Sequence, residues 1–379
     1  MNAELPPVTV PQADPGAAYR ALKEPIDAAV ARVLESGWYI LGRECAAFEE
    51  AFARWQGAGR AIGVANGTDA LALILRGLGI GAGHAVATVS HTAVATVAAI
   101  EMVGATPILI DIDPATYTMD PDELEAVLRA PPAGLPPIRA VIPVHLYGQP
   151  AAIEAIVALA DRHGAAVIED CAQCHGATAG NRKAGTFGRA AAFSLYPTKN
   201  LGALGDGGVI ATDDTALAER IAALRQYGWK ERYVSDLPGV NARLDEIQAA
   251  ILTVKLARLD AANARRAEIA ARYDAALAGT GFAPPARRPG TTHVFHQYVI
   301  RCADRAAAQA HFRARGIGTN VHYPVPVHAQ PAYRDRVPLG PARCRKTERA
   351  AAEVLSLPMF PELADAQVEQ VCAALRALN

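Results

Sequence analysis

The feature that most constrains this chain is a pair of short apolar runs that each lead into polar side chains. Residues 165–168 lead to Asp170, and residues 190–195 contain Ser194 and lead to Lys199. Such runs are typical of buried strands in an α/β sheet, which places ligands just beyond the carboxyl ends of its strands. One edge of the sheet would therefore offer an acid, a hydroxyl and a lysine to the same ligand.

Strand and helix patterns alternate through the first 250 residues. Asp120 followed by Pro121 is a typical helix start. The sequence predicts strands at 61–64, 85–89, 106–110 and 138–144, and helices at 69–78, 92–103, 121–129, 151–163 and 214–227. This alternation predicts a mostly parallel sheet with helices on both faces.

The chain of 379 residues is long enough for one large domain and a smaller one. We expect a proline-rich N-terminal arm at 1–15, a large α/β domain at 16–250 and a small α+β domain at 251–379. A helix at 17–35 follows the arm, and a long helix at 244–278 leads into the small domain. That domain would hold a strand at 296–301 and a helix at 304–315, and residues 355–360 would close back onto the core.

Composition excludes several classes of protein. The formal net charge is -1, so no overall field attracts nucleic acid or an anionic membrane. The N-terminus lacks the basic start and apolar segment of a signal peptide, and no apolar run approaches the ~18 residues of a membrane-spanning helix. We therefore expect a cytoplasmic protein whose six cysteines are reduced.

The acid, hydroxyl and lysine have one specific joint use. Pyridoxal phosphate needs a lysine to hold its aldehyde as a Schiff base, an acid to keep its pyridine nitrogen protonated, and donors for its phosphate. A lysine after a Pro-Thr turn is more often a solvated surface residue. The three residue types alone would favour an ordinary charged loop.

Several motifs in a fixed order favour the pyridoxal-phosphate site over the ordinary charged loop. They are Asn66-Gly67-Thr68-Asp69-Ala70-Leu71, Pro143-Val-His145-Leu-Tyr147-Gly148-Gln149, Asp170-Cys-Ala-Gln173-Cys-His-Gly-Ala, Phe193-Ser194-Leu-Tyr-Pro-Thr-Lys199-Asn-Leu-Gly, Gly239-Val-Asn241-Ala-Arg243-Leu244-Asp245-Glu246 and His322-Tyr323-Pro324-Val-Pro-Val-His328. With them the chain resembles, over nearly its whole length, the DegT-type (StrS-like) sugar aminotransferases. The resemblance implies the type I pyridoxal-phosphate fold of aspartate aminotransferase, with pyridoxal 5'-phosphate as cofactor.

The resemblance also implies roles for individual residues. Lys199 would hold the cofactor and then move the proton, and Asp170 would pair with the pyridine nitrogen. Gln173 would reach the ring, while Gly67, Thr68 and Ser194 would bind the phosphate. Asn241 would reach the phosphate from the other subunit, which implies a homodimer with shared active sites. His322, Tyr323 and His328 would lie near the sugar, and no metal is implied.

One position departs from the family pattern. Family members often carry an aromatic residue, stacked on the cofactor ring, where this chain has Ala93. Either His91 takes the stacking role or the face of the ring is covered in another way.

The implied reaction moves an amino group from an amino acid, L-glutamate by family habit, to a nucleotide-linked keto-deoxy sugar. The run from Tyr196 to Gly208 resembles family members that act on 3-keto sugars more than those that act on 4-keto sugars. A related branch of dehydrases has histidine at the position of Lys199, so the lysine argues against dehydration. A non-catalytic regulatory protein that binds cofactor or sugar is the alternative from another class.

Other patterns have competing interpretations. Cys171-Ala-Gln-Cys174-His175 matches a haem c attachment motif, but the chain shows no export signal, and a zinc site would need further ligands. The turn from Gly202 to Gly208 lacks the order of a P-loop. Asn66-Gly67-Thr68 is also a literal N-glycosylation acceptor, which has no use without export. Arg225, Lys230 and Arg232 fit either a solvated helix end or a diphosphate site, and Glu169 is taken as structural.

Overall fold

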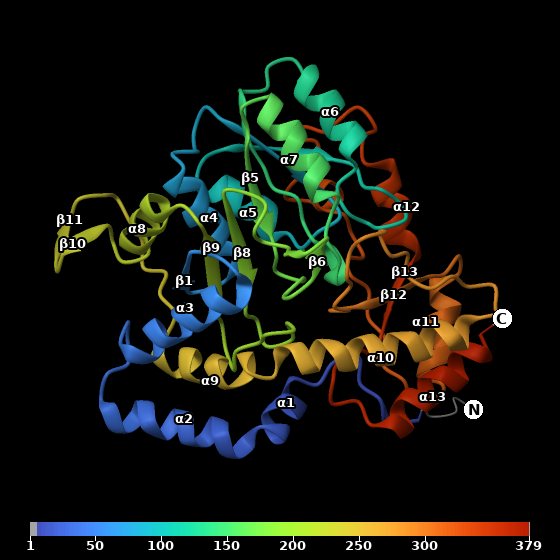
Figure 1. Ribbon diagram of the computed structural model, residues 1–379. Helices are drawn as coiled ribbons and strands as arrows, with labels where there is room; N and C mark the ends of the chain where they lie inside the picture. Colours follow the sequence, from blue (N-terminus) through green and yellow to red (C-terminus); the bar gives the residue numbers. More distant parts are fainter. Residues whose placement is uncertain (1–5, 379) are drawn as a thin grey trace.

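The computed structural model describes residues 6–378. Its centre is a seven-stranded sheet with the strand order β1-β9-β8-β5-β4-β2-β3 (Figure 1). The strands are β1 (Arg60–Val64), β2 (Ala85–Val89), β3 (Thr106–Ile110), β4 (Ile138–Val141), β5 (Ala166–Asp170), β8 (Ala190–Ser194) and β9 (Gly208–Thr212). Only β9 runs antiparallel to its neighbours, so the prediction of a mostly parallel sheet is confirmed.

Helices cover both faces of this sheet, as the alternating sequence pattern predicted. The core on one face contains α4 (Gly67–Gly77), α5 (Ala95–Met102) and α8 (Thr215–Leu224). The other face is covered by α6 (Pro121–Arg129) and α7 (Ile153–Arg162) at one end, and by α3 (Arg43–Gln56) and α9 (Glu246–Leu256) at the other. Within β8, Ala190 and Ala192 face the first core while Ala191 and Phe193 face the second, as the two-residue period of a strand requires.

The C-terminal part forms a core of its own around the antiparallel pair β12 (Tyr298–Arg301) and β13 (Val354–Leu357). The helices α10 (Leu259–Leu277), α11 (Arg305–Arg313) and α13 (Asp365–Arg376) contribute to this core, and α12 (Arg345–Glu353) precedes β13. Val10 of the predicted arm pairs with Ile317 here, and the first five residues of that arm lie outside the described residues. Val327 and Val337 instead pack on Leu109 of β3, and the boundary at residue 250 stays a prediction.

Two helices predicted as continuous are broken, and those predictions were wrong. The helix expected at 17–35 is split into α1 (Pro15–Ala21) and α2 (Lys23–Ser36) around Leu22. Pro25 explains the break, because its ring has no N–H and would clash with the carbonyl of Ala21 in a continuous helix.

The helix expected at 244–278 is divided into α9 and α10 at Ala257 and Arg258. No glycine or proline stands at this bend. The packing partner changes there, because α9 lies on α2 and α3 while α10 lies on α13 (Figure 1). The tertiary environment therefore decides the bend, which the helical periodicity of the sequence does not show.

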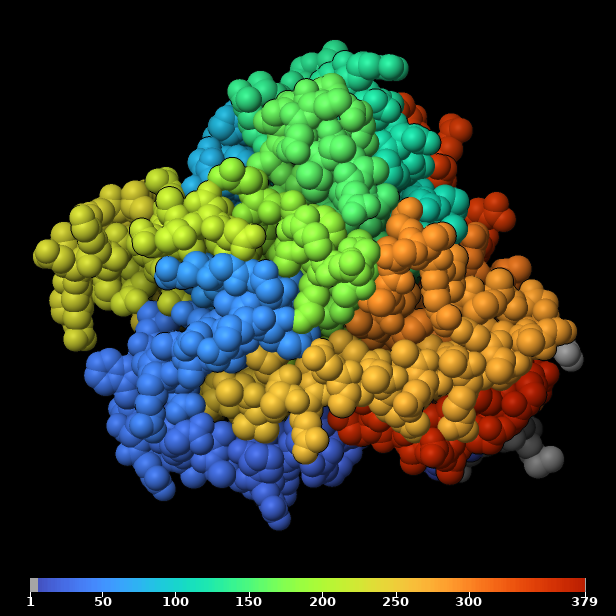
Figure 2. Space-filling view, viewed as in Figure 1, coloured from blue at the N-terminus to red at the C-terminus, as the bar shows by residue number. Residues whose placement is uncertain are grey.

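Short hairpins complete the fold. The pair β6 (Thr178–Ala179) and β7 (Arg182–Lys183) follows β5, and β10 (Trp229–Glu231) with β11 (Val234–Ser235) projects from the body at the left of Figures 1 and 2. Single 3-10 turns lie at Leu146–Gly148 and Val327–Ala329. Among residues 6–378, no helix has both the length and the apolar character needed to cross a membrane.

Candidate active site

A cavity of about 510 Å³ lies at the carboxyl ends of the parallel strands. Asp170 is the last residue of β5 and Ser194 the last of its neighbour β8, and Lys199 follows five positions later. All three line the cavity, together with Gly67, Thr68 and Gln173. Six of the seven predicted cofactor residues are therefore brought together in one chain.

The start of α4 supplies donors for an anion. The side chain of Asn66 accepts a hydrogen bond from the Asp69 N–H at 2.8 Å and so caps the helix. The N–H groups of Gly67 and Thr68 have no partner in their own helix, because the first N–H groups of a helix never do. Beside them lies Ser194, so close that a Cβ on Gly67 would stand 2.8 Å from the Ser194 Cβ. This end of the cavity fits a phosphate.

Asp170 is held rigidly at the other end of the cavity. Its Oδ2 accepts a hydrogen bond from the Thr96 hydroxyl at 2.9 Å, and its Oδ1 accepts one from the Ala172 N–H at 3.1 Å. Thr96 is in turn within 3.1 Å of the Thr92 hydroxyl. Burial raises the pKa of Asp170, while these donors and the charge of Lys199 counteract the rise. A cationic ring nitrogen beside the carboxylate would supply the counter-charge that burial demands.

Burial also prepares Lys199 for chemistry. It lowers the pKa of the amine from 10.5 to about 8, and the carboxylate of Asp170 partly opposes this effect. About a tenth of an amine with this pKa is unprotonated at pH 7, a far larger fraction than in an exposed lysine. The side chain can therefore attack a carbonyl and later accept or return a proton.

The lowered pKa predicts how the protein captures its cofactor. Only the neutral amine attacks an aldehyde, so the rate of covalent capture by cofactor-free protein should rise about tenfold per pH unit below pH 8 and level off above it. Stopped-flow absorption at 400–430 nm, roughly the range of such linkages, would follow the reaction. A rate that keeps rising to pH 10 would show instead that the lysine is not desolvated.

The predicted sugar-site residues are not equivalent in the structure. The Tyr323 hydroxyl accepts a hydrogen bond from the amide of Gln173 at 3.0 Å, so this tyrosine reaches the cavity wall. The His322 ring instead contacts the Ser356 hydroxyl at 2.8 Å, and its carbonyl accepts a hydrogen bond from the Tyr147 hydroxyl. His328 contacts Ser90 at 2.7 Å and Glu348 at 3.2 Å and is absent from the cavity lining. The position of His328 suits a residue that anchors the loop from His322 to His328.

His91 does not line the cavity that would hold the cofactor ring. It is fully buried, packs against Tyr117 and Tyr147, and places its Nε2 2.9 Å from the Tyr147 hydroxyl. Burial lowers its pKa to about 4, so the ring is neutral. Ala93, in contrast, lines the cavity. The position of His91 therefore favours the second alternative drawn from the sequence, in which the face of the ring would be covered in another way.

Glu169 is structural, as expected. Its carboxylate accepts hydrogen bonds from the backbone N–H groups of Gly185, Phe187 and Gly188 and lies 2.9 Å from Nε2 of His145. His145 accepts the Ala151 N–H at its other nitrogen. This buried pair fixes the turn that leads into β8 and thereby positions Ser194.

The thiols of Cys171 and Cys174 lie with His145 in one group whose possible ligand atoms are within 4.8 Å of one another. All three residues are fully buried, and both nitrogens of His145 already have partners. No lone pair of the imidazole is therefore free for a metal without breaking those contacts. His175, the histidine of the literal haem motif, packs instead against Phe193.

The remaining sequence patterns acquire structural reasons. A Cβ on Gly202 would lie 2.4 Å from the Pro197 carbonyl oxygen, and one on Gly208 would lie 2.4 Å from that of Asn66. The glycine-rich turn thus lets the backbone pack closely beside the phosphate end. Arg225 forms an ion pair with Glu49 and donates to the Gly63 carbonyl at 2.6 Å, so it is structural. Lys230 and Arg232 are exposed on the projecting hairpin.

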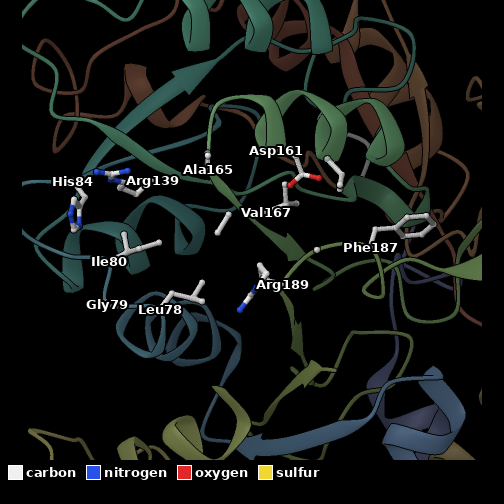
Figure 3. Close-up of a pocket in the computed structure, with 14 residues that line it drawn as sticks. Leu78, Gly79, Ile80, His84, Arg139, Asp161, Ala165, Val167, Phe187 and Arg189 are labelled. Atoms are coloured by element: carbon white, nitrogen blue, oxygen red, sulfur yellow. The ribbon is translucent and has the colours of Figure 1, made fainter. Parts of the chain in front are cut away.

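Another cavity, of about 560 Å³, opens at the amino ends of the strands (Figure 3). Arg139 of β4, Arg189 just before β8 and Asp161 of α7 line it, and Arg189 forms an ion pair with Asp214. Its lining contains no lysine. This cavity therefore lies at the wrong end of the sheet for the chemistry described above.

The comparisons with known proteins agree with this geometry. The DegT/DnrJ/EryC1/StrS aminotransferase family matches residues 20–376. The chain belongs to this family. It is 46% identical over 369 residues to the erythromycin biosynthesis sensory transduction protein EryC1 of Saccharopolyspora erythraea, which covers 97% of this chain and 99% of that protein. It is 45% identical over 376 residues to the dTDP-3-amino-3,4,6-trideoxy-alpha-D-glucose transaminase of Streptomyces venezuelae, with 99% and 97% covered.

Solved structures support the fold and the cofactor. DesV of Streptomyces venezuelae, in complex with a ketimine intermediate, superimposes with a TM-score of 0.93 at 45% identity and covers 98% of both chains. NtdA of Bacillus subtilis with bound cofactor PMP gives a TM-score of 0.89 at 29% identity, with 99% of this chain and 85% of that chain covered. The type I fold is confirmed, and the chain is an aminotransferase that depends on pyridoxal phosphate.

Proposed function

We propose that this aminotransferase moves an amino group from L-glutamate to carbon 3 of a nucleotide-linked keto-deoxy sugar. The observation that carries the proposal is one cavity that unites Lys199, Asp170 and the start of α4. Support for a nucleotide sugar, and for carbon 3, comes from the name of the Streptomyces venezuelae transaminase, which is similar over nearly the whole chain.

In this proposal each residue of the cavity has a defined role. Pyridoxal phosphate, when bound, supplies an aldehyde for a lysine and a ring that withdraws electrons. Lys199 holds the cofactor and then moves a proton between donor carbon and cofactor. Asp170 keeps the ring nitrogen charged, and Gly67, Thr68 and Ser194 hold the phosphate. Gln173, which donates a hydrogen bond to the Tyr323 hydroxyl, would contact the ring.

The donor and the acceptor can be tested separately. We expect L-glutamate to bleach the visible band of the cofactor-loaded protein, and a dTDP-linked or UDP-linked 3-keto sugar to restore it. A 4-keto sugar should restore the band at least about tenfold more slowly, because an amino acceptor one carbon away misplaces the reacting atom. Equal rates, or recovery with the 4-keto sugar alone, would contradict the assignment to carbon 3.

A regulatory role is the second candidate, because the similar protein EryC1 is named a sensory transduction protein. Such a protein would bind the cofactor or the sugar without turnover. Production of 2-oxoglutarate over many cycles with both substrates present separates the two roles. Bleaching once by glutamate without further product would favour regulation.

We also propose a homodimer with shared active sites. Asn241 is exposed, pairs with Gln226 and does not line the cavity of its own chain. Near Gln226 an open pocket of about 630 Å³ contains Trp38 and Tyr39. These two side chains are 62% and 47% exposed, and Tyr233 on the projecting hairpin is 73% exposed. An apolar surface of this kind favours a second copy of the chain as its partner.

Mixing of inactive variants tests the shared site. We expect the Lys199→Ala and Asn241→Ala variants, denatured together and refolded as a mixture, to recover about a quarter of wild-type activity, since a mixed dimer has one intact site. The matched control pairs Lys199→Ala with Asp170→Asn, two changes in the same cavity, and should recover nothing. Equal recovery in both mixtures, or none in either, would refute sharing through Asn241.

A further inference from the structure

A small cavity of about 80 Å³ lies beside the loop that carries Lys199. Its walls come from distant parts of the chain. Charged residues from four segments face it: Asp14 just before α1, Lys199, Lys255 at the end of α9 with Arg258 and Arg266 after it, and Glu362 after β13. In Figure 1, α1, the start of α10 and the chain before α13 meet at the base of the molecule.

Among residues 6–378, two of these cations, Lys255 and Arg266, have only neutral hydrogen-bond partners. The Lys255 amine donates to the Gly202 carbonyl. Arg266 is 4% exposed, and its Nη1 donates to the carbonyls of Phe295 at 3.1 Å and Met359 at 2.9 Å. Its Nε is buried and has no partner among the described residues. Within residues 6–378, neither Lys255 nor Arg266 forms an ion pair.

The two carboxylates do not neutralise these cations directly. Asp14 forms an ion pair with Arg20 and caps α1 by accepting the Ala17 N–H at 3.1 Å. Glu362 raises the pKa of Lys255 and Arg266 from a distance, but burial outweighs it. As a result the pKa of Lys255 falls to about 8 and that of Arg266 to about 10. Positive charge is therefore in excess, and burying it without a counter-charge costs free energy.

We propose that this cavity is a binding site for a small anion, either a halide or a carboxylate group. The cavity is small, about 80 Å³ against about 510 Å³ for the cavity lined by Lys199 and Asp170, which favours a ligand of a few atoms. A nucleotide or a sugar is too large. The anion would accept hydrogen bonds from Arg266 Nε and from the Lys255 amine. It would thereby hold together three segments: the residues before α1, the bend between α9 and α10, and the Lys199 loop.

Thermal unfolding of the full-length, cofactor-loaded protein tests this site. Sodium chloride and sodium formate are titrated separately at constant ionic strength, with sodium gluconate, an anion too large for the cavity, as the balancing salt. We expect a saturable rise in Tm of about 2–5 °C with chloride, formate or both, because a ligand that binds only the folded state stabilises it by mass action. Comparison of the chloride and formate titrations distinguishes a halide site from a carboxylate site.

Two variants separate the site from a general salt effect. Lys255→Met removes one cation of the cavity and should abolish the saturable rise. Lys183→Met is the matched control, because Lys183 is also partly buried and also donates to a carbonyl, that of Trp55, but does not line this cavity. It should keep the full response. A Tm that does not change with either anion, or an equal rise in Lys255→Met, overturns the proposal.

Crystals soaked in bromide provide a second readout that does not depend on stability. An anomalous peak between Lys255 and Arg266 would support the site. A well-diffracting soaked crystal with no peak there, while chloride raises Tm in solution, would place the anion elsewhere and overturn the proposal. Neither measurement requires turnover, so a failure of the proposed sugar substrate would leave this test intact.

Discussion

Replacing Lys199 with alanine should lower kcat at least about 10⁴-fold. The same side chain holds the cofactor and moves the proton, and loss of a positioned general base alone costs about 10²–10⁴. The visible absorption band of the cofactor-loaded protein should disappear as well. Both would be measured with L-glutamate and a nucleotide-linked keto sugar, alongside Tm.

The matched control is Lys183→Ala. Lys183 lies outside the cavity, with its amine over the ring of Trp55 at 3.9 Å, so its removal should leave kcat and the band unchanged. Thermal stability should differ little in Lys199→Ala, because the amine that is lost is a desolvated group whose pKa is already lowered. If Lys199→Ala retained more than about 1% of wild-type kcat with a normal band, another lysine would carry the reaction.

Replacing Asp170 with asparagine should lower kcat about 10²–10³-fold, the usual cost of removing one preorganised charge from a reacting centre. The amide can still accept from the Ala172 N–H and can donate to the Thr96 hydroxyl, so the local structure should persist. Only the charge opposite the ring nitrogen is lost. Steady-state kinetics with saturating cofactor would give the change in kcat.

Two further measurements show whether charge, rather than shape, is responsible. The carboxylate raises the pKa of Lys199, so Asp170→Asn should move the midpoint of cofactor capture below pH 8. Thr96→Val removes one donor to the carboxylate and should cost about tenfold in kcat, within the range for a hydrogen bond to a charged group. An unchanged midpoint in Asp170→Asn would mean that the two groups do not interact.

Much of the site could be read from the sequence because its residues stand at the ends of strands. Asp170 and Ser194 each stand at the end of an apolar run. The capping residue Asn66 and the glycine that follows it indicate a helix start that can bind an anion. These are local signals, and the parallel sheet brings strand ends together at one edge whatever the loops do. The order of strands and helices followed from periodicity for the same reason.

What supports those residues was not visible in the sequence. Thr96 holds Asp170, and Tyr147 joins His91 to the carbonyl of His322. Glu169 accepts hydrogen bonds from the turn before β8 and is itself held by His145. The sequence around a threonine in an apolar helix, or around a buried histidine, does not indicate which residue it will contact. Such pairs exist only once elements distant in sequence have packed together.

Hydrophobic period and capping act over a few residues, so the sequence alone predicted the alternation of strands and helices and with it the α/β class. The cofactor and the role of Lys199 followed from the resemblance of the ordered motifs to a known family. Only the tertiary structure shows where α9 bends into α10 and that His91 packs against Tyr117 and Tyr147 instead of lining the cavity. It also gathered Lys255 and Arg266 into one cavity. These features depend on which surfaces of the chain pack together, and that packing is decided by the burial of side chains against residues distant in sequence.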